Sequence, residues 1–201
     1  MRKGLLFIVS GPAGSGKGTV VNELIAKHPS LTLSISATTR QPRPGEVDGV
    51  HYHFISKEEF EQRINDGKML EYATYSGNYY GTPQKEVEEA MREGKDVILE
   101  IEVAGAMQIK EKIKDSVAIM LTPPSRDVLE ARLRGRGTET EDVIKWRLER
   151  AKEELSLMPQ YDYSVINEDN KSDECAEMIY TIIKAEHQRT IYTSQIIEKF
   201  I

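Results

Sequence analysis

The chain has 201 residues, of which 39% are hydrophobic and 30% are charged, so it is long enough for a globular domain with a sizeable core. Its net charge of −6 at pH 7 argues against broad nonspecific binding to nucleic acid. No apolar run approaches the roughly 20 residues that a membrane-spanning helix needs. The single cysteine, Cys175, excludes an internal disulfide and suits a reducing compartment. We therefore expect a cytoplasmic protein that has no signal peptide and binds neither nucleic acid nor a membrane.

The first chemical signal is a glycine-rich stretch near the start of the chain. It follows an apolar run over residues 5–9 and precedes a helical pattern of apolar residues. Strand, glycine turn and helix in this order form the context of a phosphate-binding loop, where backbone N–H groups and the helix N-terminus face the phosphates. The residues of this stretch are Gly11, Pro12, Ala13, Gly14, Ser15, Gly16, Lys17, Gly18 and Thr19.

Two positions of this loop carry its chemistry. Lys17 would bring a cation to the β- and γ-phosphates of a nucleotide. Gly18 stands where a serine or threonine usually binds Mg²⁺, and Thr19 comes one residue late. We interpret the stretch as a variant phosphate-binding loop; the alternative is a glycine turn without a ligand.

The segment 34–83 is polar, aromatic and broken by turns, and we expect it to form a small lobe inserted between core elements. The elements predicted here are strands over 31–36, 51–55 and 69–75, a helix over 57–66 and a turn over 76–83. Arg40 and Arg43 lie three residues apart on a proline-rich loop and can converge on one anion; a solvated basic turn is the alternative. His51 and His53 share a strand face, which is a weak metal signal, and we favour a packing or solvated role.

In the rest of the chain, apolar strands alternate with helices. Strands are predicted over 96–102, 116–122 and 161–167. Helices are predicted over 84–93, 104–113 and 125–134. A further helix is predicted from a cap at Thr138 to about 157, and the last one begins at 172. The buried side of this last helix is expected to include Cys175, Met178 and Ile179. This order predicts an α/β fold, a P-loop NTPase-type parallel sheet with helices on both faces.

Candidate charged residues lie at the end of the strand over 96–102 and around the turn before the helix that ends near 157. Glu100 and Glu102 end a buried strand, where ligands sit in open α/β sheets, and they are candidates for organising Mg²⁺ or its water shell. The alternative for Glu102 is that it begins or caps the next helix. Glycines flank Arg136 on a turn, and Arg147 lies on the following helix. A flap with these arginines would be a lid over the phosphate loop, and pairing within the helices is the alternative.

Four segments together resemble guanylate kinase, a member of the nucleoside monophosphate kinase family. They occur in the family's order and spacing and cover nearly the whole chain. The segments are Ser36-x-Thr38-Thr39-Arg40-x-Pro42-Arg43-x-Gly45-Glu46, Gly49-x-x-Tyr52, Gly77-Asn78-Tyr79-Tyr80-Gly81-Thr82 and Gly135-Arg136-Gly137-Thr138. The resemblance implies ATP-dependent phosphorylation of GMP to GDP, with Mg²⁺ and by in-line transfer, in purine nucleotide metabolism.

The resemblance also implies roles for single residues. The catalytic cations around the ATP phosphates and the transferred group are Lys17, Arg136 and Arg147. ATP is expected to bind the glycine-rich loop and, on its adenine side, Asn167. The residues expected to bind GMP are Ser36, Arg40, Arg43, Tyr52, Glu71, Tyr80, Thr82 and Glu100. Of these, the arginines and tyrosines match the phosphate positions, whereas Glu71 and the two hydroxyls match the base positions.

The expected role of Glu71 has a physical reason. Guanine offers N–H donors at N1 and N2, whereas adenine has an acceptor at N1 and no 2-amino group. A buried carboxylate accepts from guanine and is left unpaired and repelled by adenine. Ser36 and Thr82 can donate to guanine O6.

The chain departs from the family pattern at the Glu100–Glu102 pair and at two single residues. Glu100 and Glu102 stand where the family often has Asp-x-Asp, and Ala104 stands where glutamine is frequent. Gly18 is the third, and in nucleoside monophosphate kinases with this variant the phosphates and water hold most of the metal. None of the three removes a charge that the chemistry needs.

We expect one guanylate-kinase-like domain over about 4–187. Its predicted parts are a P-loop core (1–33, 84–125 and 156–201), a GMP-binding lobe (34–83) and a lid (126–155). The protein is expected to be a monomer or a homodimer. The functional alternatives are a non-catalytic binding module of the same fold and a kinase for another nucleoside monophosphate.

Overall fold

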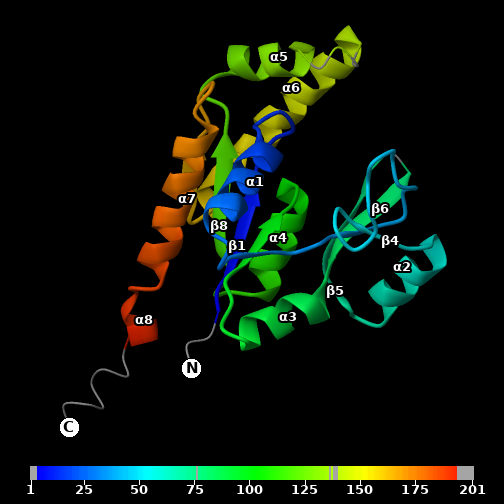
Figure 1. Ribbon diagram of the computed structural model, residues 1–201. Coiled ribbons are helices and arrows are strands. Elements are labelled where there is room, and N and C mark those ends of the chain that lie inside the picture. The colour runs from blue at the N-terminus through cyan, green and yellow to red at the C-terminus, as the bar shows by residue number, and fades with distance from the viewer. Residues whose placement is uncertain (1–3, 76, 136, 138–139, 194–201) are drawn as a thin grey trace.

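The structure, a computed structural model, describes residues 4–75, 77–135, 137 and 140–193 (Figure 1). Its strands form a five-stranded sheet and a separate four-stranded sheet. The second sheet stands to one side of the first, on the right in Figure 1. None of the helices in the described ranges is both long and apolar enough to cross a membrane.

The five-stranded sheet is the centre of the fold, and its strand order is β2-β7-β1-β8-β9. The strands are β1 (Leu6–Ser10), β2 (Thr32–Leu33), β7 (Val97–Glu100), β8 (Val117–Thr122) and β9 (Tyr163–Ile166). Every neighbouring pair is parallel. All residues of β1 and β8 are buried, as expected for parallel strands that are covered on both faces. The predicted parallel sheet is therefore confirmed.

Helices cover both faces of this sheet. On one face, α1 (Lys17–Lys27) and α7 (Ser172–Glu186) pack against β1 and β8 through an apolar cluster that includes Val20, Leu24 and Ile179. On the other face, α3 (Gln84–Arg92) and α4 (Val103–Lys112) pack through a second cluster that includes Val87, Ala106 and Ile109. Cys175 is buried in the first cluster, as predicted, but Met178 is 54% exposed, so its predicted burial is wrong.

The four-stranded sheet has the order β4-β3-β6-β5. Its strands, β3 (Ala37–Thr38), β4 (His53–Phe54), β5 (Met69–Tyr75) and β6 (Asn78–Pro83), all come from the segment 34–83. Helix α2 (Lys57–Asn65) packs on this sheet through Phe60, which is fully buried with Ala37 and next to Met69. Ser56 Oγ caps α2 by accepting from the Glu59 N–H at 3.1 Å.

Two predicted elements of this segment are wrong. The strand predicted over 31–36 is divided between the two sheets, with β2 at its start and β3 just beyond its end. The turn predicted over 76–83 is mostly strand β6, which pairs with β5 as an antiparallel hairpin. Gly77 makes the tight turn with φ +77°, so the glycine signal belongs to the hairpin turn and the tyrosines and threonine that follow belong to the strand.

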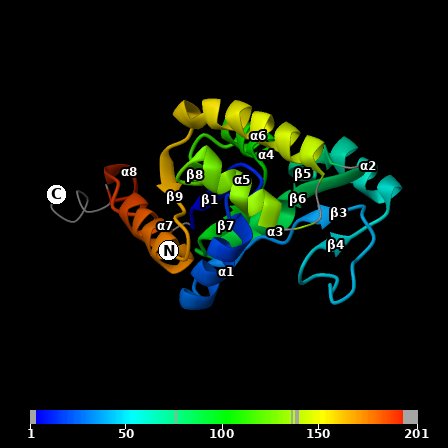
Figure 2. The same cartoon turned by 90° about the horizontal axis from the view of Figure 1, so that it is seen from above.

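Two further helices lie above the carboxyl end of the central sheet in Figure 1, α5 (Arg126–Gly135) and α6 (Glu141–Ser156). They pack on each other through Leu129, Leu133, Ile144, Leu148 and Ala151. Figure 2 shows α6 along one side of the central strands and α1 along the other. The predicted cap Thr138 lies outside the described residues, and the residue before α6 is Thr140. A short turn (Met158–Gln160) leads to β9, and α8 (Thr190–Thr193) follows α7.

Candidate functional site

The glycine-rich loop lies at the carboxyl end of β1 and runs into α1. Three of its glycines have positive φ angles, +153° at Gly11, +93° at Gly14 and +91° at Gly16. A Cβ atom on Gly16 would lie 2.3 Å from Asn167 Nδ2, and one on Gly11 would lie 2.1 Å from the Leu121 carbonyl oxygen. These positions therefore need glycine both for backbone conformation and for space.

Lys17 is the cation at the centre of this loop. It is 9% exposed, and its Nζ donates to the carbonyl oxygens of Gly11, at 2.6 Å, and Pro12, at 3.4 Å. The same Nζ lies 3.5 Å from Glu102 Oε1. Lys17 is thus held over the loop by two carbonyls and one carboxylate, and an anion in the loop would find the ammonium group already in position.

The hydroxyl groups of the loop differ in their surroundings. Ser15 is fully buried, and its Oγ has no hydrogen-bond partner among the described residues. Such a hydroxyl is available to a phosphate oxygen or a water. Thr19 is exposed on the surface of α1.

Glu100 and Glu102 lie at the carboxyl end of β7, beside the loop. Burial raises the pKa of Glu100, the charge of Lys17 opposes that shift, and Glu102 adds to it. A Cβ atom on Gly18 would lie 3.5 Å from Glu100 Oε1, so this carboxylate faces the position that lacks a hydroxyl. Glu102 is the N-cap residue of α4, but its side chain makes no cap hydrogen bond and faces Lys17 instead.

Asn167 and Arg132 support the loop through the backbone carbonyl of Ser15. The buried Asn167 side chain donates from Nδ2 to the Ser15 carbonyl at 2.8 Å. Arg132 Nη2 donates to the Asn167 carbonyl at 2.8 Å, and its Nη1 lies 3.5 Å from the Ser15 carbonyl oxygen. The resemblance assigns Asn167 to the adenine side of ATP, and Arg132 has no predicted role, because neither backbone contact has a signature in the sequence.

The arginines of the 40–46 loop form a second charged centre. Arg40 makes a two-pronged ion pair with Glu46, in which both N–O distances are 2.9 Å. The Arg40 guanidinium is 5.5 Å from the ring centre of Tyr52 and 5.7 Å from that of Phe54. Its hydrogen bonds lower the pKa of the Glu46 carboxyl to about 2. Arg43 has an exposed side chain, and its backbone N–H donates to Glu46 at 2.6 Å.

Tyr52 and Tyr80 belong to this charged centre. Their rings meet edge to face with centres 6.1 Å apart, and a hydrogen bond to Tyr80 helps to raise the pKa of Arg40. Burial raises the pKa of Tyr52, and the negative charge of Glu100 is the second cause. The structure therefore brings three of the predicted GMP-binding residues, Arg40, Tyr52 and Tyr80, together.

Glu71 is a buried carboxylate on β5, only 4% exposed. Thr82 Oγ1, on the paired strand β6, donates to Glu71 Oε1 at 2.7 Å. Burial raises the pKa of Glu71 to about 6, while the Thr82 hydrogen bond and the charge of Lys112 lower it. Ser36 lies between β2 and β3, and its carbonyl accepts from the His53 N–H at 2.9 Å.

The remaining predicted residues lie on or near α5 and α6. Arg147 Nη2 donates to the Tyr75 hydroxyl at 3.2 Å, which links α6 to the end of β5. Arg136 lies outside the described residues. Arg150 and Glu154 pair within α6 at 3.0 Å, and Arg134 pairs with Glu130 at 2.8 Å, so some helix arginines do pair locally.

The two histidines of the lobe make separate contacts. His51 Nδ1 accepts from the Val47 N–H at 3.0 Å, and His53 Nε2 lies 3.1 Å from Glu86 Oε2. Across the described part of the chain, no group of three or more histidine, cysteine, aspartate or glutamate residues could hold a metal ion.

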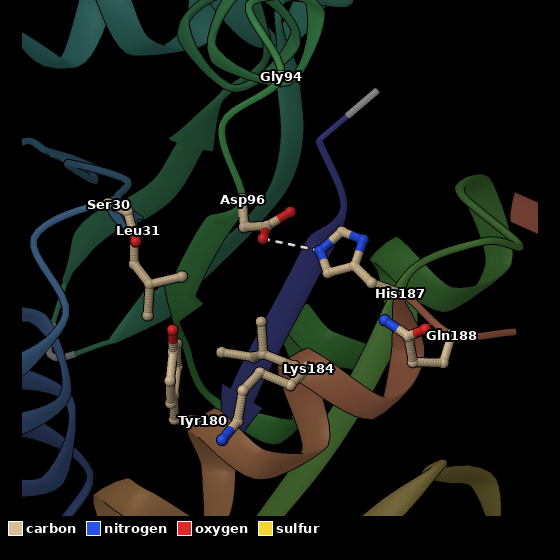
Figure 3. A pocket seen from close by; sticks show the side chains of 9 residues that line it. Ser30, Leu31, Gly94, Asp96, Tyr180, Lys184, His187 and Gln188 are labelled. Carbon is tan, nitrogen blue, oxygen red and sulfur yellow. Dashed lines mark hydrogen bonds and ion pairs between the residues drawn. The ribbon is translucent and has the colours of Figure 1, made fainter. Parts of the chain in front are cut away.

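A cavity of about 460 Å³ lies at the other end of the sheet, near the start of β7 (Figure 3). His187 Nε2 and Asp96 Oδ2 form a hydrogen bond at 2.8 Å beside it, and Asp96 Oδ1 accepts from the Leu5 N–H at 2.9 Å. These contacts fasten the end of α7 to the edge of the sheet. The cavity is remote from the glycine-rich loop, because the loop follows the carboxyl end of β1.

The close packing of the loop gives a testable prediction. We expect Gly16→Ala to lower the free energy of unfolding by about 2 kcal/mol or more, because it adds a clash with Asn167 to the cost of a positive φ. Gly45→Ala is the matched control, since Gly45 has φ +88° and a Cβ there would meet nothing within 4 Å. Urea unfolding of both variants would separate the two effects, and equal losses would contradict the contact with Asn167.

Comparison with known proteins gives consistent matches. A family model described as guanylate kinase matches residues 3–186. The guanylate kinase of Lactococcus lactis subsp. lactis (strain IL1403) is 51% identical over 199 residues, which cover 99% of this chain and 95% of that protein. The guanylate kinase of Streptococcus thermophilus (strain CNRZ 1066) is 53% identical over 188 residues, which cover 93% of this chain and 89% of that protein. The crystal structure of guanylate kinase from Anaplasma phagocytophilum has 32% identity and a TM-score of 0.75, covering 94% of this chain and 89% of that one.

Proposed function

The chain belongs to the guanylate kinase family, and we propose that it transfers the γ-phosphoryl group of ATP to GMP, forming ADP and GDP. The observation that carries this proposal is the pairing of a lysine-containing glycine loop with a buried carboxylate, Glu71, on the second sheet. The first feature suits a nucleoside triphosphate, and the second suits a guanine base. Helix α4 connects the two features. Its N-cap residue, Glu102, faces Lys17 of the loop, and the helix packs on β5, the strand of Glu71.

We assign the ATP phosphates to the glycine-rich loop and Lys17. The loop offers backbone N–H groups and the N-terminus of α1, where phosphates are favoured. The position of Lys17 over Gly11 and Pro12 supports this assignment. We assign Arg147 and Arg136 to the transferred phosphoryl group because they match cation positions of the guanylate kinase family. Asn167 supports the loop through the Ser15 carbonyl.

We assign the GMP phosphate to Arg40, Arg43, Tyr52 and Tyr80, and the base to Glu71, Thr82 and Ser36. The Arg40–Glu46 pair supports the first assignment, because a carboxylate occupies the fork of the guanidinium as a phosphate would. The Thr82 hydroxyl bonds one oxygen of Glu71, which supports the second.

Catalysis in this proposal consists of positioning and charge neutralisation. An oxygen of the GMP phosphate attacks the γ-phosphorus in line, ADP leaves, and no covalent enzyme intermediate forms. We assign Lys17 to the charge that develops on the phosphoryl oxygens, since its ammonium group is held over the glycine-rich loop. Closure of the lobe (34–83) and the lid (126–155) over the core would exclude water as a competing acceptor.

Mg²⁺ is the metal that fits this site. Glu100 and Glu102 supply the hard carboxylate oxygens that Mg²⁺ prefers, and Glu100 faces the space beside Gly18. Bound Mg²⁺ would neutralise charge on the β- and γ-phosphates. Glu100 and Glu102 would hold its water shell. We further propose a cytoplasmic enzyme of purine nucleotide metabolism that acts as a monomer or homodimer and binds neither nucleic acid nor membranes.

The test is a coupled assay of ADP release with ATP and Mg²⁺, in which GMP, AMP, UMP and dTMP are compared. We expect kcat/KM for GMP to exceed that for AMP by about 10⁴-fold, because a site built around a buried acceptor rejects a base without the matching donors. Activity with a different monophosphate would mean that Glu71 is misassigned. No turnover with any of them, from folded protein, would favour a non-catalytic binding module.

A further inference from the structure

Helix α4 and strand β5 meet along one face of the helix, on both sides of Glu71. Gln108 accepts from the Tyr72 N–H at 3.2 Å and donates from Nε2 to the Tyr72 carbonyl at 2.9 Å. Lys112 Nζ donates to the Leu70 carbonyl at 2.7 Å. The backbone of both residues that flank Glu71 is therefore held by side chains of one helix.

Gly105 lies one turn before Gln108 on the same face and makes room for the carboxylate. A Cβ atom on Gly105 would lie 2.5 Å from Glu71 Oε2 and 3.0 Å from Glu71 Cδ. Glycine in the third position of a helix lowers helix stability, and the backbone of Gly105 has no positive φ that would demand it. The space for Glu71 is the structural reason for glycine at this position.

The strand needs this support, because β5 is irregular where Glu71 lies. The pairing of β5 with β6 shifts register between Met69 and Glu71, and Met69, Leu70 and Glu71 are all buried, whereas a regular strand alternates. A bulge of this kind re-aims a side chain. Leu70 also belongs to the apolar cluster that packs on α4.

From these contacts we infer that Gly105, Gln108 and Lys112 are positioning residues that fix the orientation of the Glu71 carboxylate and so set the preference for GMP over AMP. The inference rests on the proposed function. Two guanine N–H groups must meet the carboxylate in one geometry, and a displacement of about 1 Å can lower the rate by about 10²-fold. Gly105 defines where the carboxylate lies, and Gln108 and Lys112 keep the strand from shifting along the helix.

The first test is Gly105→Ala, with kinetic constants measured for GMP, AMP and ATP. We expect KM for GMP to rise by about 10- to 100-fold and the ratio of kcat/KM for GMP to that for AMP to fall by a similar factor. KM for ATP should change less than about twofold, because the three atoms nearest to a Cβ on Gly105 all belong to Glu71 and none to the glycine-rich loop. Equal changes for GMP and ATP, or an unchanged KM for GMP, would overturn the inference.

The second test avoids a new atom in the packed interior. Lys112→Met removes the contact with the Leu70 carbonyl, and Lys114→Met is the control, since it removes the same charge from an exposed residue just beyond α4. We expect Lys112→Met to raise KM for GMP at least threefold with little change in KM for ATP, and Lys112→Arg to restore part of the loss. A Lys112→Met variant that matches Lys114→Met would contradict the role of Lys112.

Wild-type protein separates this inference from the proposed function. If it does not phosphorylate GMP, the proposed function fails. If it phosphorylates GMP while the Gly105 and Lys112 variants keep the GMP-to-AMP ratio, only the positioning role fails. Urea unfolding of each variant shows whether the change in KM goes beyond a loss of folded protein.

Discussion

Lys17→Met is expected to lower kcat for GMP phosphorylation by about 10²- to 10³-fold, which is the effect of removing one preorganised electrostatic contact to a developing charge. Lys17 is buried over the glycine loop, where screening by water is weak. Its Nζ has two carbonyl partners and the Glu102 carboxylate, so the ammonium group is in position before substrates bind. Steady-state kinetics with saturating ATP and GMP measure the loss.

Lys27→Met is the matched control for this variant. Lys27 lies in the last turn of the same helix, and its Nζ is 3.6 Å from Glu177 at the surface. We expect this substitution to leave kcat within about twofold of wild type, since surface ion pairs contribute little. A Lys17→Met enzyme with wild-type kcat would remove Lys17 from the mechanism.

Glu71→Gln is expected to lower kcat/KM for GMP by about 10²-fold and, at the same time, to stabilise the free protein. Each hydrogen bond to a charged group is worth about 1.5–3 kcal/mol, and the amide N–H₂ of glutamine would face the guanine donors. The ratio of kcat/KM for GMP to that for AMP should fall with it. The same coupled assay, with both nucleotides, measures the change.

The stabilising effect follows from the pKa of Glu71. Burial raises this pKa from 4.5 to about 6, a shift that corresponds to about 2 kcal/mol. Because the pKa is raised in the folded state, the favourable contribution is complete below pH of about 4.5 and is lost as the pH rises through about 6. At pH 7.5, Glu71→Gln should therefore raise the free energy of unfolding by up to about 2 kcal/mol, and the gain should shrink near pH 4.5.

The same titration predicts the pH dependence of GMP binding. Protonation of Glu71 removes an acceptor, so KM for GMP should rise more steeply below about pH 6 in the wild type than in Glu71→Gln, in which only the GMP phosphate, with a second pKa of about 6, still titrates. Thr82→Val provides a comparison, because it removes the hydroxyl that bonds Glu71 Oε1 without changing the charge. A KM for GMP that is independent of pH between 5 and 7 would mean that the carboxylate does not contact the base.

Periodicity and turn residues predicted the central sheet well. The apolar runs of β1, β7 and β8 are buried on both faces, and such strands have an unambiguous sequence pattern. The second sheet was harder to predict, since β3 and β4 are two residues each and pair with distant partners. Strand β6 was mistaken for a turn because its hydroxyl and glycine residues are typical of loops.

Some residues of the candidate site can also be predicted from sequence, whereas others cannot. The glycine loop and the loop of Arg40 have spacings that sequence alone can identify. The contacts of Arg132 with the Ser15 and Asn167 carbonyls, and of Gln108 with the Tyr72 backbone, join segments far apart in the chain. Every residue has a backbone carbonyl, so a contact with one leaves no pattern of residue types from which these partners could be predicted.

The packing of α5 on α6 has a thermodynamic consequence. The five buried apolar residues that hold this pair together all lie on these two helices, from Leu129 to Ala151. If the pair rotates as a unit, the apolar contacts between the two helices stay closed, and within this cluster only the small contact of Leu129 and Leu133 with Gly14 changes. A motion that exposes little apolar surface has a small heat-capacity change, whereas unfolding has a large one. The balance between open and closed forms should therefore vary little with temperature, even where the stability of the whole chain varies strongly.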